Sequence, residues 1–96
     1  MDILISYDVN SLTKEGRSRL RRVAKACKNF GQRVQFSVFE CSVTDTQMEK
    51  LRQKALSIMD EKEDNLRIYY LKGPRKDYLE AHGRDMYIDF HDPLVV

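Results

Sequence analysis

Residues 32–43 of the 96-residue chain read QRVQFSVFECSV, and this stretch decides between two folds. Val34, Phe36 and Val38 alternate with polar neighbours, and a period of two is typical of β structure. No Gly or Pro marks a turn inside the stretch, so periodicity alone predicts one long strand. A bend in its middle would instead give two consecutive strands, and the pattern leaves both alternatives open.

The segments on either side predict a strand and two helices. The apolar residues 3–5 (ILI) predict a buried strand within residues 1–10. Apolar residues at helical spacing predict one helix over residues 14–29, with Gly31 as its stop. A second helix is expected to start at a Thr-x-x-Gln or Thr-x-x-Glu capping box and to run over residues 44–59.

The second half of the chain completes the order of elements. Residues 60–64 (DEKED) predict a solvated loop, and residues 66–71, rich in Ile and Tyr, predict a strand. If residues 32–43 form one strand, the fold is a small three-stranded parallel sheet. If they bend, the order becomes βαββαβ, the ferredoxin-like arrangement of the α+β class. Residues 86–90 have the character of an extra C-terminal β segment, and the apolar residues 94–96 are expected to dock on a neighbour.

Length and composition bound the class of protein. The chain holds 42% hydrophobic and 33% charged residues, which indicates one ordinary globular domain, with a core of residues 1–71 and an extension of residues 72–96. No apolar run approaches the roughly 18 residues of a membrane span, and no signal sequence opens the chain, so we expect no membrane partner and a cytoplasmic location. Cys27 and Cys41 lack CxxC spacing and are interpreted as small buried hydrophobes.

The helix expected over residues 14–29 is strongly basic. Its cations are Lys14, Arg17, Arg19, Arg21, Arg22, Lys25 and Lys28, against the one acid Glu15. Arg17, Arg21, Lys25 and Lys28 share one face at spacings of four, four and three. A solvated face usually mixes both signs of charge, so this pattern also favours binding of a phosphate backbone.

Asp8 is the candidate for chemistry. In a strand, Ile3, Ile5 and Tyr7 lie on one face, and Asp8 lies on the other face at the strand end. A carboxylate at the end of a buried strand is well placed for catalysis, although Asp also favours turns and could simply cap the following loop.

Three stretches carry a resemblance to a known family. They are residues 5–9 (ISYDV), residues 31–40 (GQRVQFSVFE) and residues 67–71 (RIYYL). With the Arg-rich helix, they resemble the CRISPR-associated protein 2 family, the small protein of the spacer-acquisition module. The match covers residues 1–71, and after residue 72 only residues 93–96 (PLVV) look similar.

The resemblance implies a ferredoxin-like fold that bends near residues 35–37. It implies a homodimer whose two sheets face each other, with the C-terminal strand added to the partner's sheet. Members are described as metal-dependent endonucleases acting on single-stranded RNA or double-stranded DNA. They also form the centre of a complex with the CRISPR-associated protein 1 integrase, so a non-catalytic nucleic-acid-binding adaptor is the alternative function.

The resemblance also implies site residues. The catalytic group is expected at Tyr7, Asp8 and Ser37, with Asp8 binding Mg²⁺ or Mn²⁺. Arg33 carries over as an expected nucleic-acid-binding residue, and the basic helix adds Arg17, Arg19, Arg21, Arg22 and Lys25 to that expectation. The interface residues are Phe39, Leu94 and Val95, and Tyr7 is expected to pack beside Phe39 there. One carboxylate is a poor Mg²⁺ site, so the second is expected from a two-fold axis near Asp8.

A third class of function, a ferredoxin-like domain that binds a small regulatory ligand, would need a pocket motif. The sequence offers no glycine-rich loop for such a ligand.

Overall fold

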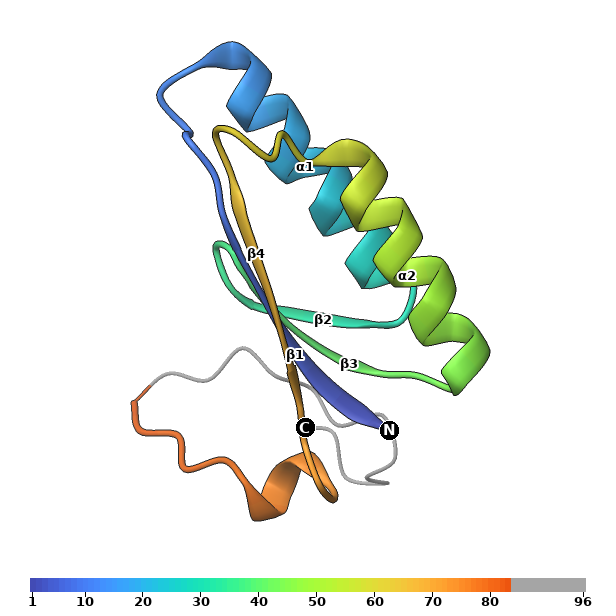
Figure 1. Ribbon diagram of the computed structural model, residues 1–96. Coiled ribbons are helices and arrows are strands. Elements are labelled where there is room, and N and C mark those ends of the chain that lie inside the picture. Colours follow the sequence, from blue (N-terminus) through green and yellow to red (C-terminus); the bar gives the residue numbers. More distant parts are fainter. Residues whose placement is uncertain (84–96) are drawn as a thin grey trace.

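A four-stranded sheet covered by two helices on one side forms the architecture of the computed structural model, which describes residues 1–83 (Figure 1). The elements in chain order are β1 (Asp2–Asp8), α1 (Lys14–Lys28), β2 (Gly31–Gln35), β3 (Val38–Ser42), α2 (Asp45–Ile58), β4 (Asn65–Tyr70) and the 3₁₀ helix η1 (Arg75–Asp77). The strand order is β2-β3-β1-β4, and all three neighbouring pairs are antiparallel. The predicted βαββαβ ferredoxin-like fold is confirmed, whereas the predicted C-terminal β segment, residues 86–90, lies outside the described residues.

Residues 32–43 bend between Gln35 and Val38, which decides between the two alternatives and confirms the bend that the family resemblance implies near residues 35–37. The turn between β2 and β3 is held from two sides. The Tyr7 backbone N–H donates to the Ser37 carbonyl at 2.9 Å, and the Arg33 Nε donates to the Phe36 carbonyl at 2.7 Å. Among the described residues, no non-Gly residue has a positive φ, so this turn needs no glycine to form. Alternation alone misses such a turn because β2 and β3 share the same period.

Side-chain caps define where both helices begin. The Thr13 hydroxyl accepts the Gly16 N–H at 3.0 Å, and Thr44 with Gln47 forms the reciprocal capping box that opens α2. Gly31 does not end α1 as predicted, because it is the first residue of β2. A Cβ at Gly31 would lie 2.0 Å from the Glu40 carbonyl oxygen, so glycine is needed there for strand packing.

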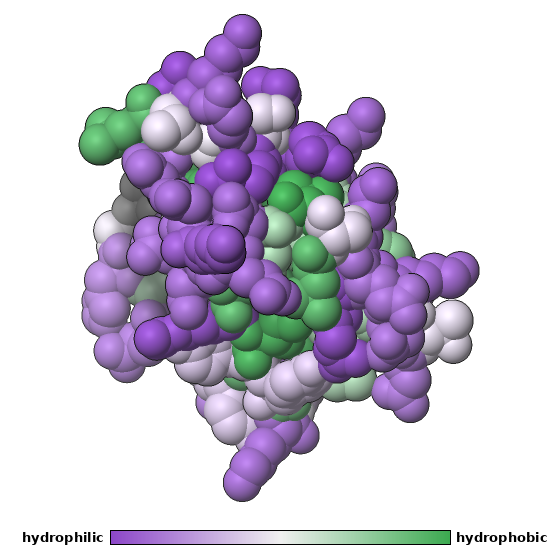
Figure 2. Space-filling view, turned by 45° about the horizontal axis from the view of Figure 1, so that its top comes forward, coloured by the Kyte–Doolittle hydropathy of each residue, from purple (hydrophilic) through white to green (hydrophobic). Residues whose placement is uncertain are grey.

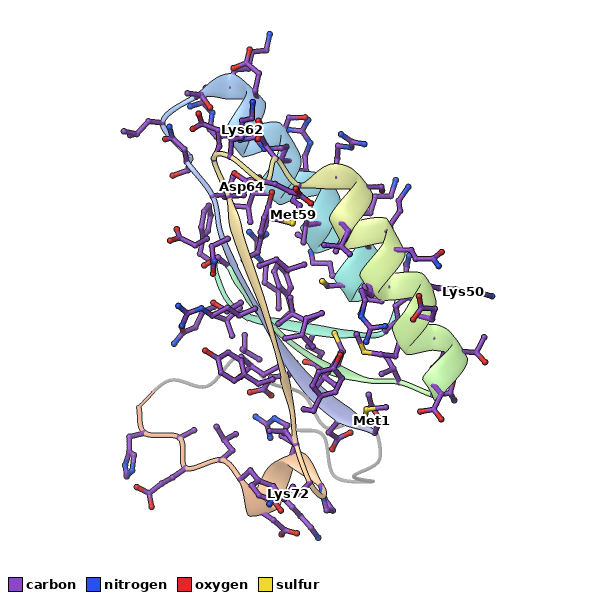
Figure 3. The ribbon with its side chains drawn as sticks, viewed as in Figure 1. Met1, Lys50, Met59, Lys62, Asp64 and Lys72 are labelled. Atoms are coloured by element: carbon purple, nitrogen blue, oxygen red, sulfur yellow. The ribbon has the colours of Figure 1, made fainter. Side chains whose placement is uncertain are left out.

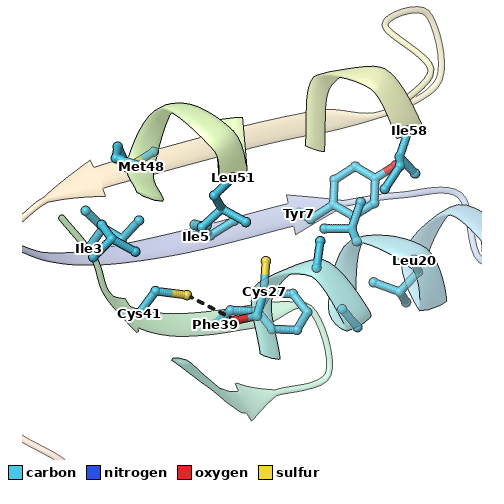
Figure 4. Close-up of a cluster of buried hydrophobic side chains, with 14 residues drawn as sticks. Ile3, Ile5, Tyr7, Leu20, Cys27, Phe39, Cys41, Met48, Leu51 and Ile58 are labelled. Carbon is cyan, nitrogen blue, oxygen red and sulfur yellow. Dashed lines mark hydrogen bonds between the residues drawn. The ribbon is translucent and has the colours of Figure 1, made fainter. Parts of the chain in front are cut away.

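The core lies between the sheet and the helices (Figure 4). Ile3, Ile5 and Tyr7 of β1 face the helices as predicted, and each is at most 1% exposed. The other large buried side chains are Leu20, Val23, Cys27, Phe39, Cys41, Met48, Leu51 and Ile58. Both cysteines are buried and free, which confirms their interpretation as small core residues. Neither helix of residues 1–83 combines the length and apolar character needed to cross a bilayer.

A buried carboxylate joins β1, α1 and the loop before β4. The Tyr7 hydroxyl donates to Asp64, and the Arg19 guanidinium binds both carboxylate oxygens at 2.8 and 3.1 Å. The Asp60 backbone N–H adds a hydrogen bond at 3.0 Å. Asp64, labelled in Figure 3, lies in the loop before β4. Its side chain is 0% exposed, so the prediction that the whole acidic run forms a solvated loop was wrong at this position.

The charge state of Asp64 follows from these partners. Burial acts to raise the pKa of the Asp64 carboxyl, but hydrogen bonds from Arg19 and Tyr7 outweigh it and lower that pKa below 3.8. Burial, together with the adjacent carboxylate, raises the pKa of the Tyr7 hydroxyl far above its ordinary value. Asp64 is therefore ionised and Tyr7 neutral across the physiological range.

We expect Asp64→Asn to lower the free energy of unfolding at neutral pH by about 2 kcal/mol, because Arg19 loses its partner while keeping some contact with water. The pKa of Asp64 is lowered in the folded state, so the charge stabilises the fold fully above the ordinary pKa of 3.8 and loses this effect as pH falls through the lowered pKa. The difference in free energy of unfolding between wild type and variant, measured by urea unfolding, should be smaller near pH 3 than at neutral pH. The exposed Glu63→Gln serves as control, and a gap of equal size at both pH values would contradict the assignment.

Candidate functional site

Asp8 is exposed on the face of the sheet opposite the helices. It is the last residue of β1 and pairs with Asn65 of β4. Asn10, not Asp8, makes the Asx turn of the following loop, since its Oδ1 accepts the Leu12 N–H at 3.1 Å. The carboxylate of Asp8 is therefore not needed to cap this turn.

Arg67 shares this face with Asp8. Arg67 pairs with Ser6, two residues before Asp8, so strand alternation places both charged side chains on the same side of the sheet. Its Nη1 contacts the Tyr69 hydroxyl at 3.4 Å. Chiefly Tyr69, and in addition the charge of Asp8, raise the pKa of the Arg67 guanidinium. The sequence pattern did not single out Arg67, because its position depends on the register of β4 against β1.

Ser37 lies close to Asp8 along the backbone. Its carbonyl accepts the N–H of Tyr7, the residue before Asp8, at 2.9 Å. The β2–β3 turn therefore comes beside the end of β1. Fold and turn together bring two of the three predicted catalytic residues, Asp8 and Ser37, to one end of the sheet.

Tyr7 and Phe39 do not lie on this surface. Both side chains are 0% exposed and point into the core beneath the helices. Because side chains alternate along a strand, Tyr7 and Asp8 point to opposite faces of the sheet. The Tyr7 hydroxyl donates a hydrogen bond to Asp64. The predicted catalytic role of Tyr7, and the predicted packing of Tyr7 and Phe39 in an interface, are therefore corrected to structural roles in the core. The other predicted interface residues, Leu94 and Val95, lie outside the described residues.

Residues 1–83 do not by themselves provide a metal site. Residues 1–83 contain no cluster of three or more His, Cys, Asp or Glu side chains that could hold an ion. Asp8 contributes one carboxylate, and Arg67 brings a positive charge to the same area. Since Mg²⁺ is commonly held by one or two carboxylates with water and phosphate oxygens, a fit at Asp8 needs ligands beyond residues 1–83 of this chain, such as a second copy or substrate would supply.

Predicted basic residues come together in a groove between α1 and the β2–β3 turn, which we name the α1–β2 groove. Its volume is about 460 Å³. The basic side chains that line it are Arg17, Arg21, Lys25, Lys28 and Arg33. The Arg33 guanidinium lies 4.9 Å from the Phe36 ring centre and 5.7 Å from that of Phe39, which holds it at the groove wall.

Two predicted nucleic-acid-binding residues lie elsewhere. Arg19 is bound by Asp64, and its side chain is only 15% exposed, so its guanidinium is not available to a phosphate. Arg22 lies on the other side of α1, where it lines a groove with Lys50 and Lys54 of α2. Neither of these lysines was singled out by the sequence pattern, although their spacing of four on an amphipathic helix places them on one face.

A further cavity, of about 520 Å³, lies at the opposite end of β1 from Asp8. The segment after β4 borders it, and there Arg75 pairs with Glu40 while the Arg75 backbone N–H donates to Asp2 at 2.8 Å. The lining of this cavity includes none of the predicted catalytic residues.

Polar residues cover most of the surface in Figure 2, with an apolar area near the centre of the view.

Comparison with known proteins gives consistent matches. A family model described as CRISPR associated protein Cas2 matches residues 1–77. The chain is 54% identical over 96 residues to the CRISPR-associated endoribonuclease Cas2 1 of Moorella thermoacetica, with 100% of each chain covered. It is 50% identical over 95 residues to the CRISPR-associated endonuclease Cas2 of Halalkalibacterium halodurans, with 99% of each chain covered. The crystal structure of Streptococcus pyogenes Cas2 matches with a TM-score of 0.81 at 47% identity, over 86% of this chain and 100% of that chain.

Proposed function

Because the chain belongs to the CRISPR associated protein Cas2 family, we propose that it is a cytoplasmic, divalent-metal-dependent endonuclease of RNA or double-stranded DNA that acts as a homodimer in CRISPR spacer acquisition, an antiviral defence. The names endoribonuclease and endonuclease of the two relatives support the reaction class. The observation that carries the proposal is the exposed Asp8 on the face of the sheet opposite the helices, with Arg67 beside it.

The homodimer is proposed to bury this face of the sheet, which no helix of residues 1–83 covers. Leu4 and Val38 are half-buried there, and Tyr69 is 47% exposed, so a second copy would remove apolar surface from water. A two-fold axis near Asp8 would bring two Asp8 carboxylates together. We propose that this pair holds Mg²⁺ or Mn²⁺, which when bound supplies positive charge for phosphodiester hydrolysis.

The chain's own residues have distinct roles in this proposal. Arg67 would bind a phosphate oxygen beside Asp8, because guanidinium groups match phosphate geometry. Ser37 would orient a water or ligand at the same end of β1. The α1–β2 groove would bind the phosphate backbone of the nucleic acid at a place distant from the site of cleavage. β1 and β4, which carry Asp8 and Arg67, contain no histidine to act as general base, so we expect slow turnover relative to binding.

The second candidate function is a non-catalytic adaptor that binds nucleic acid for the CRISPR-associated protein 1 integrase. The α1–β2 groove favours it, since this groove is lined by five cations and no acid. Asp8 discriminates the two functions, because only the nuclease requires its carboxylate.

Asp8→Asn should abolish metal-dependent cleavage while leaving DNA binding and the dimer largely intact, because it keeps the side-chain shape and removes the charge. The measurement is cleavage of RNA and duplex DNA with and without Mg²⁺ or Mn²⁺. Glu61→Gln, an exposed loop acid, is the control and should cleave as wild type. Cleavage by Asp8→Asn at the wild-type rate would leave only the adaptor function.

Tyr69→Lys should weaken the dimer, because it places a charge in the face proposed to be buried. Tyr70→Lys is a matched control: Tyr70 is similarly exposed, at 52%, but lies on the helix side, where its hydroxyl accepts from Arg52 at 2.6 Å. Light scattering at micromolar concentration should give twice the chain mass of 11.3 kDa for wild type and for Tyr70→Lys. Deleting the last four residues should also weaken the dimer. A wild-type protein that scatters light as a monomer would refute the proposed assembly.

The double variant Arg21→Glu with Lys28→Glu should weaken duplex DNA binding equally for unrelated sequences, because both cations line the α1–β2 groove. Each lost phosphate contact should reduce the slope of log affinity against log salt by about 0.9. Lys62→Glu with Lys72→Glu changes the net charge by the same amount outside this groove and is the control. Wild-type affinity and salt slope in the groove variant would exclude this surface.

A further inference from the structure

A second basic groove, which we name the α1–α2 groove, runs between the two helices. It has a volume of about 500 Å³ and is lined by Arg22 and Lys25 from α1 and by Lys50 and Lys54 from α2. No acidic side chain lines it, and its floor includes the apolar residues Ala26, Leu51 and Ile58. Lys50 projects from the side of α2 that faces away from the sheet (Figure 3).

The four cations have no ion-pair partner among residues 1–83. Glu49, the acid of α2 next to Lys50 in the sequence, has other partners. Its carboxylate accepts hydrogen bonds from Arg52 at 2.5 Å and from Gln53 at 3.2 Å. Lys50 and Lys54 are four residues apart, a spacing at which like charges on a helix destabilise each other. An anionic ligand in the groove would relieve this repulsion.

The arrangement of the cations indicates an extended anion. Charged residues three or four positions apart on a helix lie about 5–6 Å from each other, and packed helices lie roughly 8–10 Å apart. Two rows of cations therefore flank one groove, which a linear series of phosphates can follow while its sugars rest on the apolar floor.

We propose that the α1–α2 groove binds the phosphate backbone of a nucleic-acid strand, as a contact separate from the α1–β2 groove. The inference rests on the proposed nucleic-acid-binding function and extends it to a second surface. Lys25 lines both grooves, so the two contacts meet across α1. Nucleic acid is then bound on both sides of this helix.

The first test uses the wild-type full chain, so it does not depend on the folding of a variant. Lysines are labelled with an amine-reactive acetylating reagent in the presence and absence of a short duplex DNA, and each site is quantified by mass spectrometry. Labelling of Lys50 and Lys54 should fall on binding, while Lys62 and Lys72, at opposite ends of the molecule in Figure 3, stay reactive. Lys50 and Lys54 keeping their unbound reactivity would overturn the inference.

The second test compares Lys50→Glu with Lys54→Glu against the control pair Lys62→Glu with Lys72→Glu. Both double variants carry the same change in net charge. The groove variant should lose at least about tenfold in duplex affinity at moderate salt, and its salt slope should fall by about 2, whereas the control stays near wild type. Equal loss in both double variants would show only a general charge effect and would refute the groove.

Failure of this inference can be told from failure of the proposed function. If Arg21→Glu with Lys28→Glu weakens binding while Lys50→Glu with Lys54→Glu matches the control, nucleic-acid binding stands and the second groove is refuted. If every variant binds nucleic acid as the wild type does, both the α1–β2 groove and the α1–α2 groove are refuted as binding surfaces, whereas a wild type that binds no nucleic acid refutes the proposed function.

Discussion

Adjacent residues of β1 must face opposite sides of the sheet, and this constraint organises both the core and the site. β1 is an inner strand of the sheet, and the two helices cover one of its faces. Tyr7 lies on the face covered by the helices, where its hydroxyl donates a hydrogen bond to Asp64. Asp8, the next residue, lies exposed on the opposite face. The strand end that presents Asp8 is therefore held by the buried hydrogen bonds of its neighbour.

Helix α1 shows the same separation among its cations. Arg19 is bound by a buried carboxylate and belongs to the framework. Arg21 lines the α1–β2 groove, and Arg22 lines the α1–α2 groove. Consecutive helical positions point about 100° apart, so three nearly adjacent arginines meet three different environments. A uniformly basic helix thus supplies one structural ion pair and two basic surfaces.

The two faces of the sheet therefore carry different parts of the proposed function. The helix side presents the cations of the two grooves, which suit a polyanion, and the binding proposed there needs no catalytic group. The side opposite the helices presents Asp8, Arg67 and apolar residues that suit a second copy of the chain. Because a sheet separates them, changes on one side leave the chemistry of the other largely independent.

The sequence by itself determined the elements whose signals are local: the alternation of β1, the apolar stripes and caps of both helices, and the basic character of α1. It also placed Asp8 on the face opposite Tyr7. Only the tertiary structure decided the bend at residues 36–37, the partner of Arg19, and the meeting of Arg67 with Asp8. These depend on contacts between distant residues, such as Arg19 with Asp64, 45 positions apart, and on strand register. Periodicity reports which face a residue occupies, but not which distant residue it meets there.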